Sequence, residues 1–438
     1  MKINLLTVGL LACVLAGTTA RATDAEPYEQ PPFSYSATAP QDATARLQKR
    51  LAAGELKFAG TDPEMLRALL REFQVPVASQ VVVFSKTSLQ RQRIRPDHPR
   101  VIYFSDSAYI GWVPGGLMEV TTVDPVLGPI FYALDPVGLR SNTPSAFVRD
   151  NDCLRCHGGT FVRGIPSVFV RSLYTDAEGE PMLRHGSEVV DFRTPFENRW
   201  GGWYVTGKHG AALHRGNVFA QEKQDQLVVD FKRGANLASL SGFFETQDYP
   251  LNGSDIVALL VLEHQTTMQN TLTRASVNCR RMLEYQKNLQ RDLKEPVTED
   301  LTYDSVKSVF ESSAREITDD MLFQGEAQLP HGLEGSPAFQ SAFQSNSRRT
   351  TDGQSLKDFS LKGHIFANRC SYMIYSDSFL QLPVQLKRRV YDRLARVLKS
   401  KDSDSRYAYL GAEERARITR ILSETHSELS PHISQTSK

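Results

Sequence analysis

The chain changes character near residue 254, and this change constrains its fold more than any other feature of the sequence. After it, Ser254 and Asp255 begin a helical pattern that runs to about Leu293, and its first part, Ile256–Leu262, is apolar on nearly every face. A helix of this kind has to be buried. Before it, short runs of β-branched and aromatic residues alternate with Asp, Pro and Gly, which is typical of strands joined by turns. The clearest runs are 81–84, 101–104, 109–113, 118–123 and 130–134.

This order of elements predicts an α+β fold for the 438 residues, with a strand-rich N-terminal half, 23–250, and a helical C-terminal half, 251–438. The boundary near 250 is soft, because the apolar helix could pack against the first half and make one domain. Residues 23–41 are expected to be an extended leader, and 329–356 a loop. Further strands are expected at 167–173, 202–206 and 226–231, and further helices at 43–53, from 62, and at 303–321, 382–399 and 411–425.

The first residues have the pattern of a secretory signal peptide. Lys2 supplies a positive start, an apolar run covers residues 3–16, and Ala20-Arg21-Ala22 offers a cleavage site of small residues. We therefore expect residues 1–22 to be removed and the protein to be periplasmic or otherwise exported. Two alternatives stay open: the run could remain as a membrane anchor, although it is short for a span, or Cys13 could be the lipidation site of a lipoprotein.

Composition excludes several functional classes. The formal net charge is +1, which gives no reason to expect a nucleic-acid or membrane-surface partner. No later stretch is apolar enough to predict a transmembrane span in the mature chain. The sequence also lacks a nucleophile elbow, a P-loop, an HExxH pattern and a dinucleotide fingerprint, so catalytic residues stay unassigned.

One motif carries recognisable chemistry. Cys153-Leu154-Arg155-Cys156-His157 places two thiols three residues apart, with an imidazole next to the second. Two thiols at this spacing can each join one vinyl group of a haem, and the adjacent imidazole can bind the iron as its proximal ligand. The predicted export signal supports this interpretation, because c-type haem is attached after export. We expect one covalently attached haem c, bound by Cys153, Cys156 and His157.

Other interpretations of the two cysteines are a redox dithiol, half of a zinc site and a structural disulfide. A zinc ribbon needs a second ligand pair, and the sequence holds no other C-x-x-C. A redox dithiol usually follows a strand in a βαβ unit, and no such unit is visible. Of the remaining cysteines, Cys279 and Cys370 would be exported together and could form a disulfide, which the sequence leaves open.

The motif resembles the haem-attachment site of c-type cytochromes, a resemblance of about five residues. Over longer stretches the chain resembles large uncharacterised exported bacterial proteins with a cytochrome-c domain. This wider resemblance rests on Phe84–Gln90, Arg199–Gly207 and Arg369–Tyr372. It implies a monohaem protein and no particular reaction, and only the three positions of the haem motif are carried over from it.

The second axial ligand of the iron decides what such a protein does. His209 lies between two glycines after an expected strand, His214 follows shortly after, and His264 lies on the apolar helix. Each is a candidate distal ligand, and each could equally be a hydrogen-bonded core residue; Met182 is a weaker candidate.

The haem surroundings have further candidates among aromatic and basic residues. Trp200, Trp203 and Tyr204 could pack in a strand core, or could face the porphyrin or an electron path. Arg155 and Arg163 could pair with haem propionates or lie on the surface.

The leading hypothesis is an exported monohaem c-type cytochrome that binds haem and transfers electrons to or from a periplasmic redox partner protein of unknown identity. A periplasmic haem enzyme, peroxidase-like or oxidase-like, and a haem-based sensor are the alternatives. Size favours the enzyme, because roughly 100 residues, one small domain, suffice to enclose one haem, and this chain has 438.

Overall fold

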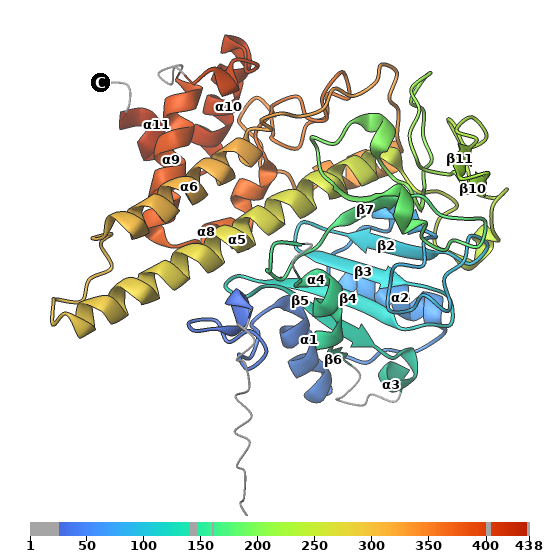
Figure 1. Ribbon diagram of the computed structural model, residues 1–438, viewed down its shortest axis with the longest axis horizontal. Helices are drawn as coiled ribbons and strands as arrows, with labels where there is room; N and C mark the ends of the chain where they lie inside the picture. The colour runs from blue at the N-terminus through green and yellow to red at the C-terminus, as the bar shows by residue number, and fades with distance from the viewer. Residues whose placement is uncertain (1–25, 141–146, 160–161, 400–403, 436–438) are drawn as a thin grey trace, which may run out of the picture.

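The computed structural model describes residues 26–140, 147–159, 162–399 and 404–435. The predicted signal peptide, 1–22, and Cys13 lie outside these residues. The fold is α+β, with the strand-rich N-terminal half and the helical C-terminal half that the sequence predicts (Figure 1). None of the described helices combines the length and the apolar character that crossing a bilayer requires.

An antiparallel sheet dominates the first half. Among the described residues it has seven strands in the order β6-β5-β4-β3-β2-β1-β9. The sequence places β1 to β5 correctly and leaves out the short β6. Their bounds are β1 (Val81–Val83), β2 (Arg100–Phe104), β3 (Ala108–Trp112), β4 (Met118–Asp124), β5 (Gly128–Leu134), β6 (Phe147–Arg149) and β9 (Trp203–Tyr204).

Two small hairpins accompany the sheet. β7 (Val170–Leu173) pairs with β8 (Ser187–Val190), and β10 (Ala220–Lys223) pairs with β11 (Gln226–Val229). The strands predicted at 167–173, 202–206 and 226–231 therefore exist, but each is shorter than expected.

The two faces of the sheet differ in what covers them. On one face, alternate residues pack against the first two helices, α1 (Ala43–Ala52) and α2 (Asp62–Glu72). The leader predicted at 23–41 joins this core, because Tyr35 is buried and donates a hydrogen bond to the Pro129 carbonyl at 2.7 Å. The cap of α2 is Thr61, in a capping box with Glu64.

The long helix α5 (Ile256–Asp292) packs on the other face of the sheet, and α4 (Leu154–His157) contributes Leu154 to the same packing. The 37 residues of α5 extend over about 55 Å, and its apolar first part is buried as predicted. Asp255 caps its first turn by accepting from the Ala258 N–H at 2.9 Å. Figure 1 shows α5 running from the sheet into the C-terminal helices.

The C-terminal half consists of helices around α5. The predicted helices near 303–321, 382–399 and 411–425 are all present. The loop predicted for 329–356 is wrong in one part, because Ser336 and Pro337 start α7, which buries Phe339 and Phe343. The helices are α6 (Asp304–Met321), α7 (Pro337–Gln344), α8 (Asp377–Leu380), α9 (Val384–Leu398), α10 (Ala412–Thr425) and α11 (Ser430–Gln435); α3 (Pro136–Arg140) lies in the first half.

One hydrophobic core crosses the expected boundary near 250. It joins Phe131 of the sheet and Val170 of the β7–β8 hairpin to side chains of α5, α6 and α10, such as Leu272, Phe310 and Ile418. The two halves therefore share their main core.

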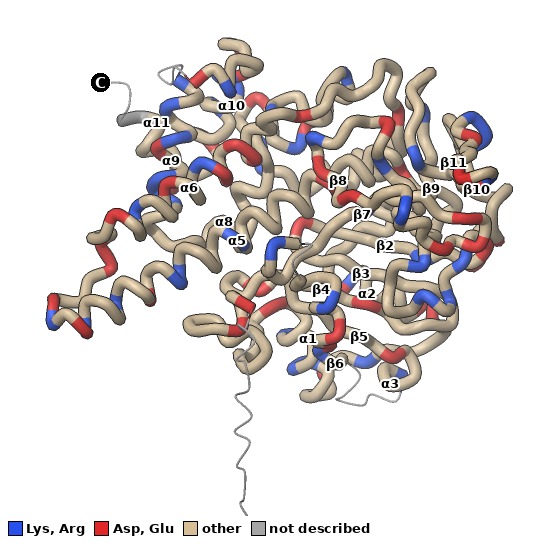
Figure 2. The backbone as a smooth tube through the Cα atoms, viewed as in Figure 1, with Lys and Arg blue, Asp and Glu red and all other residues tan. Residues whose placement is uncertain are grey.

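Basic and acidic residues are interspersed along the described chain in Figure 2, in keeping with the net charge of +1.

Asp42 connects α1 to the sheet and offers a test of this packing. Its buried carboxylate accepts from the Ala45 N–H at 2.8 Å, from the Thr122 hydroxyl at 2.8 Å and from the Tyr132 hydroxyl at 2.9 Å. We predict that Asp42→Ala lowers the free energy of unfolding by about 2–4 kcal/mol, because it removes a cap and leaves buried hydroxyls with fewer partners. Urea denaturation measures this change.

The matched control is Thr61→Ala at the exposed cap of α2, for which a loss of about 1 kcal/mol is expected. Equal losses in the two variants would contradict the role given to Asp42.

Candidate functional site

The cysteine motif forms a short helical segment that lies against the sheet. A 3-10 turn, Asn151–Cys153, leads into α4, and the Asp150 side chain starts the turn by accepting from the Asp152 N–H at 2.9 Å. Because Cys153 already has helical dihedrals, Cys156 and His157 follow it at i+3 and i+4 and share one side of the segment. Two thiols and an imidazole are therefore presented together. Cys153 is half-buried and Cys156 is exposed, and neither forms a disulfide.

A hydrogen bond determines the protonation of the His157 ring. Its Nδ1 lies 2.8 Å from the carbonyl oxygen of Ser167. A carbonyl oxygen accepts only, so Nδ1 carries the proton and the lone pair is on Nε2. Burial lowers the pKa of His157, which keeps the imidazole neutral. Among the described residues no group donates to Nε2, which leaves this atom available to a metal.

Three elements fix the orientation of His157. The Ser167 hydroxyl and N–H both donate to the His157 carbonyl, at 3.0 and 2.8 Å. Asn270 of α5 then binds Val168 twice, accepting from its N–H at 3.0 Å and donating to its carbonyl at 2.7 Å. The rings of Phe131 and Phe169 lie 4.7 and 4.9 Å from the imidazole, centroid to centroid. The sheet, α5 and the segment after α4 thus hold one ring.

The sheet face beside this segment is incompletely covered. Along β4, residues on the opposite face are buried, whereas Glu119, Thr121 and Val123 are only half-buried. Arg100 of β2 forms an ion pair with Glu119, and both charges act on His157 and on Cys153.

The Arg100 guanidinium has an unused donor in this region. Its Nε is buried and has no hydrogen-bond partner among the described residues. Gly111 on β3 leaves room for the guanidinium, because a Cβ at this position would overlap it. A carboxylate brought to this place could accept from the buried donor.

The structure bears on the alternative interpretations of the thiols. Burial raises the pKa of Cys153 to about 12, with Asp150 and Glu119 acting in the same direction. Redox-active dithiols have a lowered thiol pKa instead. In the described ranges no group of three or more His, Cys, Asp or Glu side chains is arranged to hold a metal ion, so no zinc partner ligands accompany the two thiols.

The three predicted distal ligands lie in two other places. His209 and His214 are neighbours, with ring centroids 4.5 Å apart, and pack with Trp200 and Phe196. His264 of α5 stacks on Phe323 with centroids 4.1 Å apart. In the part of the chain that the structure describes, no ring contact or hydrogen bond joins any of the three histidines to the haem motif.

The three histidines also differ in the hydrogen bonds of their ring nitrogens. Both ring nitrogens of His209 are used, Nδ1 with the Ala212 carbonyl at 2.7 Å and Nε2 with the Asn236 N–H at 3.0 Å. His214 Nε2 and His264 Nδ1 are buried and have no partner among the described residues. Burial lowers the pKa of each of these two rings to about 3, so both are neutral. The assignment of a distal ligand to any of them stays a prediction.

The three aromatic candidates all donate hydrogen bonds inside the core. Trp200 donates to the Glu263 carboxylate, Trp203 donates to the Arg171 carbonyl at 2.8 Å, and Tyr204 donates to the Pro96 carbonyl at 2.8 Å. All three rings are buried and pack in the core.

Arg155 and Arg163 are exposed and pair with Asp152 at 3.2 Å and Glu316 at 3.4 Å. Cys279 and Cys370 are both buried and free, so the disulfide that the sequence left open is absent from the structure.

Comparisons with known proteins add no relatives: no family model, no curated protein and no solved structure matches this chain. The site therefore has to be interpreted from its own geometry. The sequence alone does not identify Arg100, Phe131, Ser167 or Asn270 as residues of this site. A charged residue at the first position of a β-branched strand was the available signal for Arg100.

The tautomer of His157 can be measured directly. In protein made without its export signal, to which no haem is attached, nitrogen-15 NMR should show the proton on Nδ1, because the Ser167 carbonyl accepts it. The exposed His331 is the internal reference and should favour a proton on Nε2. The protonation midpoint of His157 should fall below its ordinary value near 6.5, because burial disfavours the charged ring. A proton on Nε2 of His157 would contradict the site geometry.

Proposed function

We propose that this protein is an exported monohaem c-type cytochrome that transfers electrons. In this proposal Cys153 and Cys156 attach one haem c covalently, and His157 is the proximal ligand of its iron. The observation that carries the proposal is the hydrogen bond from His157 Nδ1 to the Ser167 carbonyl. It leaves a neutral imidazole with its Nε2 lone pair free, beside two unpaired thiols on the same helical turn.

The surrounding residues fit a haem group. The thiols and the imidazole share one side of a helical segment, and the half-buried residues of β4 offer a surface next to it. The buried, unpartnered Nε of Arg100 suits a propionate carboxylate. When bound, haem c supplies an iron that exchanges single electrons with a partner.

Residues of the chain orient His157 and shield its ring. Ser167 raises the basicity of His157 through the hydrogen bond to Nδ1, and Asn270 fixes the position of Ser167 from α5. Phe131 and Phe169 restrict rotation of the ring and exclude water from its faces. Thioether bonds at Cys153 and Cys156 would prevent loss of haem from an exported protein. The electron partner is a periplasmic redox protein whose identity the chain does not specify.

A haem enzyme or sensor is the second candidate function, and one observation favours it. Among the described residues no ring contact or hydrogen bond joins the three predicted distal histidines to the haem motif, and His209 has both ring nitrogens occupied. An iron without a strong distal ligand binds peroxide, oxygen or nitric oxide, as an enzyme or sensor requires.

Haem attachment can be tested with matched cysteine variants. Protein exported by cells that attach c-type haem should stain for haem after denaturing electrophoresis. We predict that Cys153→Ser with Cys156→Ser abolishes the stain, because no thioether can form. The control Cys279→Ser changes a buried free thiol outside the motif and should keep the stain. A stained band in the double variant, or an unstained wild-type band, would contradict covalent attachment.

The visible spectrum separates the two candidate functions. An electron carrier should show a low-spin spectrum that carbon monoxide leaves unchanged in the ferrous state. A high-spin spectrum that responds to carbon monoxide would favour the enzyme or sensor. His209→Ala, His214→Ala and His264→Ala, measured one at a time, then test each predicted distal ligand.

A further inference from the structure

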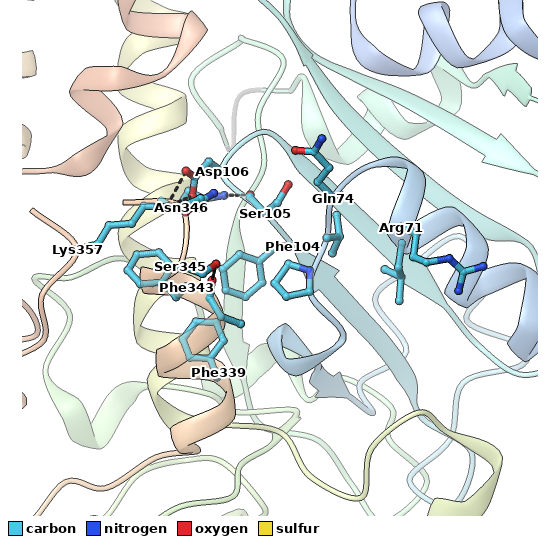
Figure 3. Close-up of a pocket in the computed structure, with 15 residues that line it drawn as sticks. Arg71, Gln74, Phe104, Ser105, Asp106, Phe339, Phe343, Ser345, Asn346 and Lys357 are labelled. Carbon is cyan, nitrogen blue, oxygen red and sulfur yellow. Dashed lines mark hydrogen bonds and ion pairs between the residues drawn. The ribbon is translucent and has the colours of Figure 1, made fainter. Parts of the chain in front are cut away.

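A cavity of about 340 Å³ lies where the end of α2, the turn between β2 and β3, and α7 come together. Its volume falls at the lower end of the roughly 300–1,000 Å³ that ligand pockets occupy. Figure 3 shows its wall of aromatic rings next to a small group of polar side chains. This combination of an apolar wall with a few convergent polar groups is typical of small-molecule sites.

The aromatic wall is built from Phe104, Phe339 and Phe343. All three rings are buried, and Phe339 lies 5.9 Å from each of the other two, centroid to centroid. Phe104 belongs to the sheet and the other two to α7, so the core holds the wall in place. A flat apolar ligand would find a preformed surface here.

The polar end is centred on Lys357. This lysine is buried, and its ammonium group lies 4.6 Å from the ring centroid of Phe343. Its nitrogen donates to both carboxylate oxygens of Asp106, at 2.9 and 2.7 Å, and to Asn346 Oδ1 at 2.9 Å. These three bonds use all three ammonium hydrogens.

The buried donors at this end, on Lys357 and Gln265, already donate within the protein, whereas the Asp106 carboxylate can still accept a hydrogen bond. Gln265 directs its amide group to the Ser105 carbonyl at 2.8 Å and to the Tyr109 hydroxyl at 2.9 Å. The Asp106 side chain is 40% exposed and keeps lone pairs beyond those that Lys357 uses. The Asp106 carboxylate can therefore accept a hydrogen bond from a ligand that lies against the aromatic wall.

The cavity is separate from the haem motif. Phe104 pairs across the sheet with Tyr109, Tyr109 with Thr121, and Thr121 with Phe131, whose ring touches His157. Three strand spacings, about 14 Å, thus separate the cavity wall from the residue that contacts His157.

We infer that this cavity binds a small aromatic molecule that carries a hydroxyl group, a ligand of the phenol class. The ring packs on Phe104, Phe339 and Phe343, and the hydroxyl donates to the Asp106 carboxylate. This inference does not depend on haem attachment, so the two proposals can fail separately.

Three related probes test the inference on the wild-type exported protein by isothermal titration calorimetry. 4-Ethylphenol has the ring and the donor, 4-ethylanisole keeps the ring with a methylated oxygen, and 4-ethylcyclohexanol keeps the donor without the aromatic ring. We expect 4-ethylphenol to bind, and 4-ethylanisole to bind at least about tenfold more weakly, because it loses a hydrogen bond to a charged acceptor. 4-Ethylcyclohexanol should also bind more weakly. Equal affinity for the phenol and the anisole, or no binding of the phenol at millimolar concentration, would overturn the inference.

Two variants locate the binding. Ala342→Phe places a large side chain in the cavity and should abolish binding of 4-ethylphenol, and thermal melting checks that the variant is folded. Asp106→Asn weakens the acceptor and should lower the affinity about tenfold. The control is Asp97→Asn, which changes an exposed carboxylate paired with Arg95 outside the cavity and should leave the affinity unchanged. Unchanged affinity in folded Ala342→Phe protein would overturn the assignment.

Discussion

The hydrogen bond between His157 and Ser167 is the interaction on which the functional interpretation depends. A thiol pair and an imidazole occur together in many proteins without binding haem. Here a backbone carbonyl fixes the proton on Nδ1 and leaves Nε2 with its lone pair. The position of this carbonyl is itself fixed, because the Asn270 side chain hydrogen-bonds to both the N–H and the carbonyl of the next residue, Val168. The long helix and the short motif are therefore parts of one site, although Asn270 and His157 are more than 100 residues apart in the sequence.

The site draws on both halves of the chain, which share a core. The motif lies on a face of the sheet that α5 also covers, and the first part of α5 is buried against that face. Helices α6, α7 and α8 pack against α5, whose C-terminal end stays partly exposed. A haem site on the sheet alone would lack the two hydrogen bonds by which Asn270 of α5 holds the segment after α4. The rest of the helical half provides one wall of the separate cavity beside α7.

The sequence predicts elements whose pattern is local. The strands from Val81 to Leu134 alternate or are continuously apolar, and α5 has a capping Asp255 and an unbroken helical pattern, so each was placed correctly. Helix α7 was missed because it is short and rich in Ser and Gln, and only its buried phenylalanines reveal its packing. The hydrogen bonds between Asn270 and Val168 join residues distant in the sequence, so no local sequence pattern predicts them. The surroundings of the predicted distal histidines likewise depend on tertiary contacts.

The most direct test of the account is the mass of the peptide that contains Cys153 and Cys156, taken from the exported protein. If His157 and the two thiols hold a haem, this peptide carries the added mass of one haem, and neither thiol reacts with an alkylating reagent. A peptide of unmodified mass with two alkylatable thiols would contradict the central claim. The chain would then be an α+β protein whose short cysteine motif has some other role.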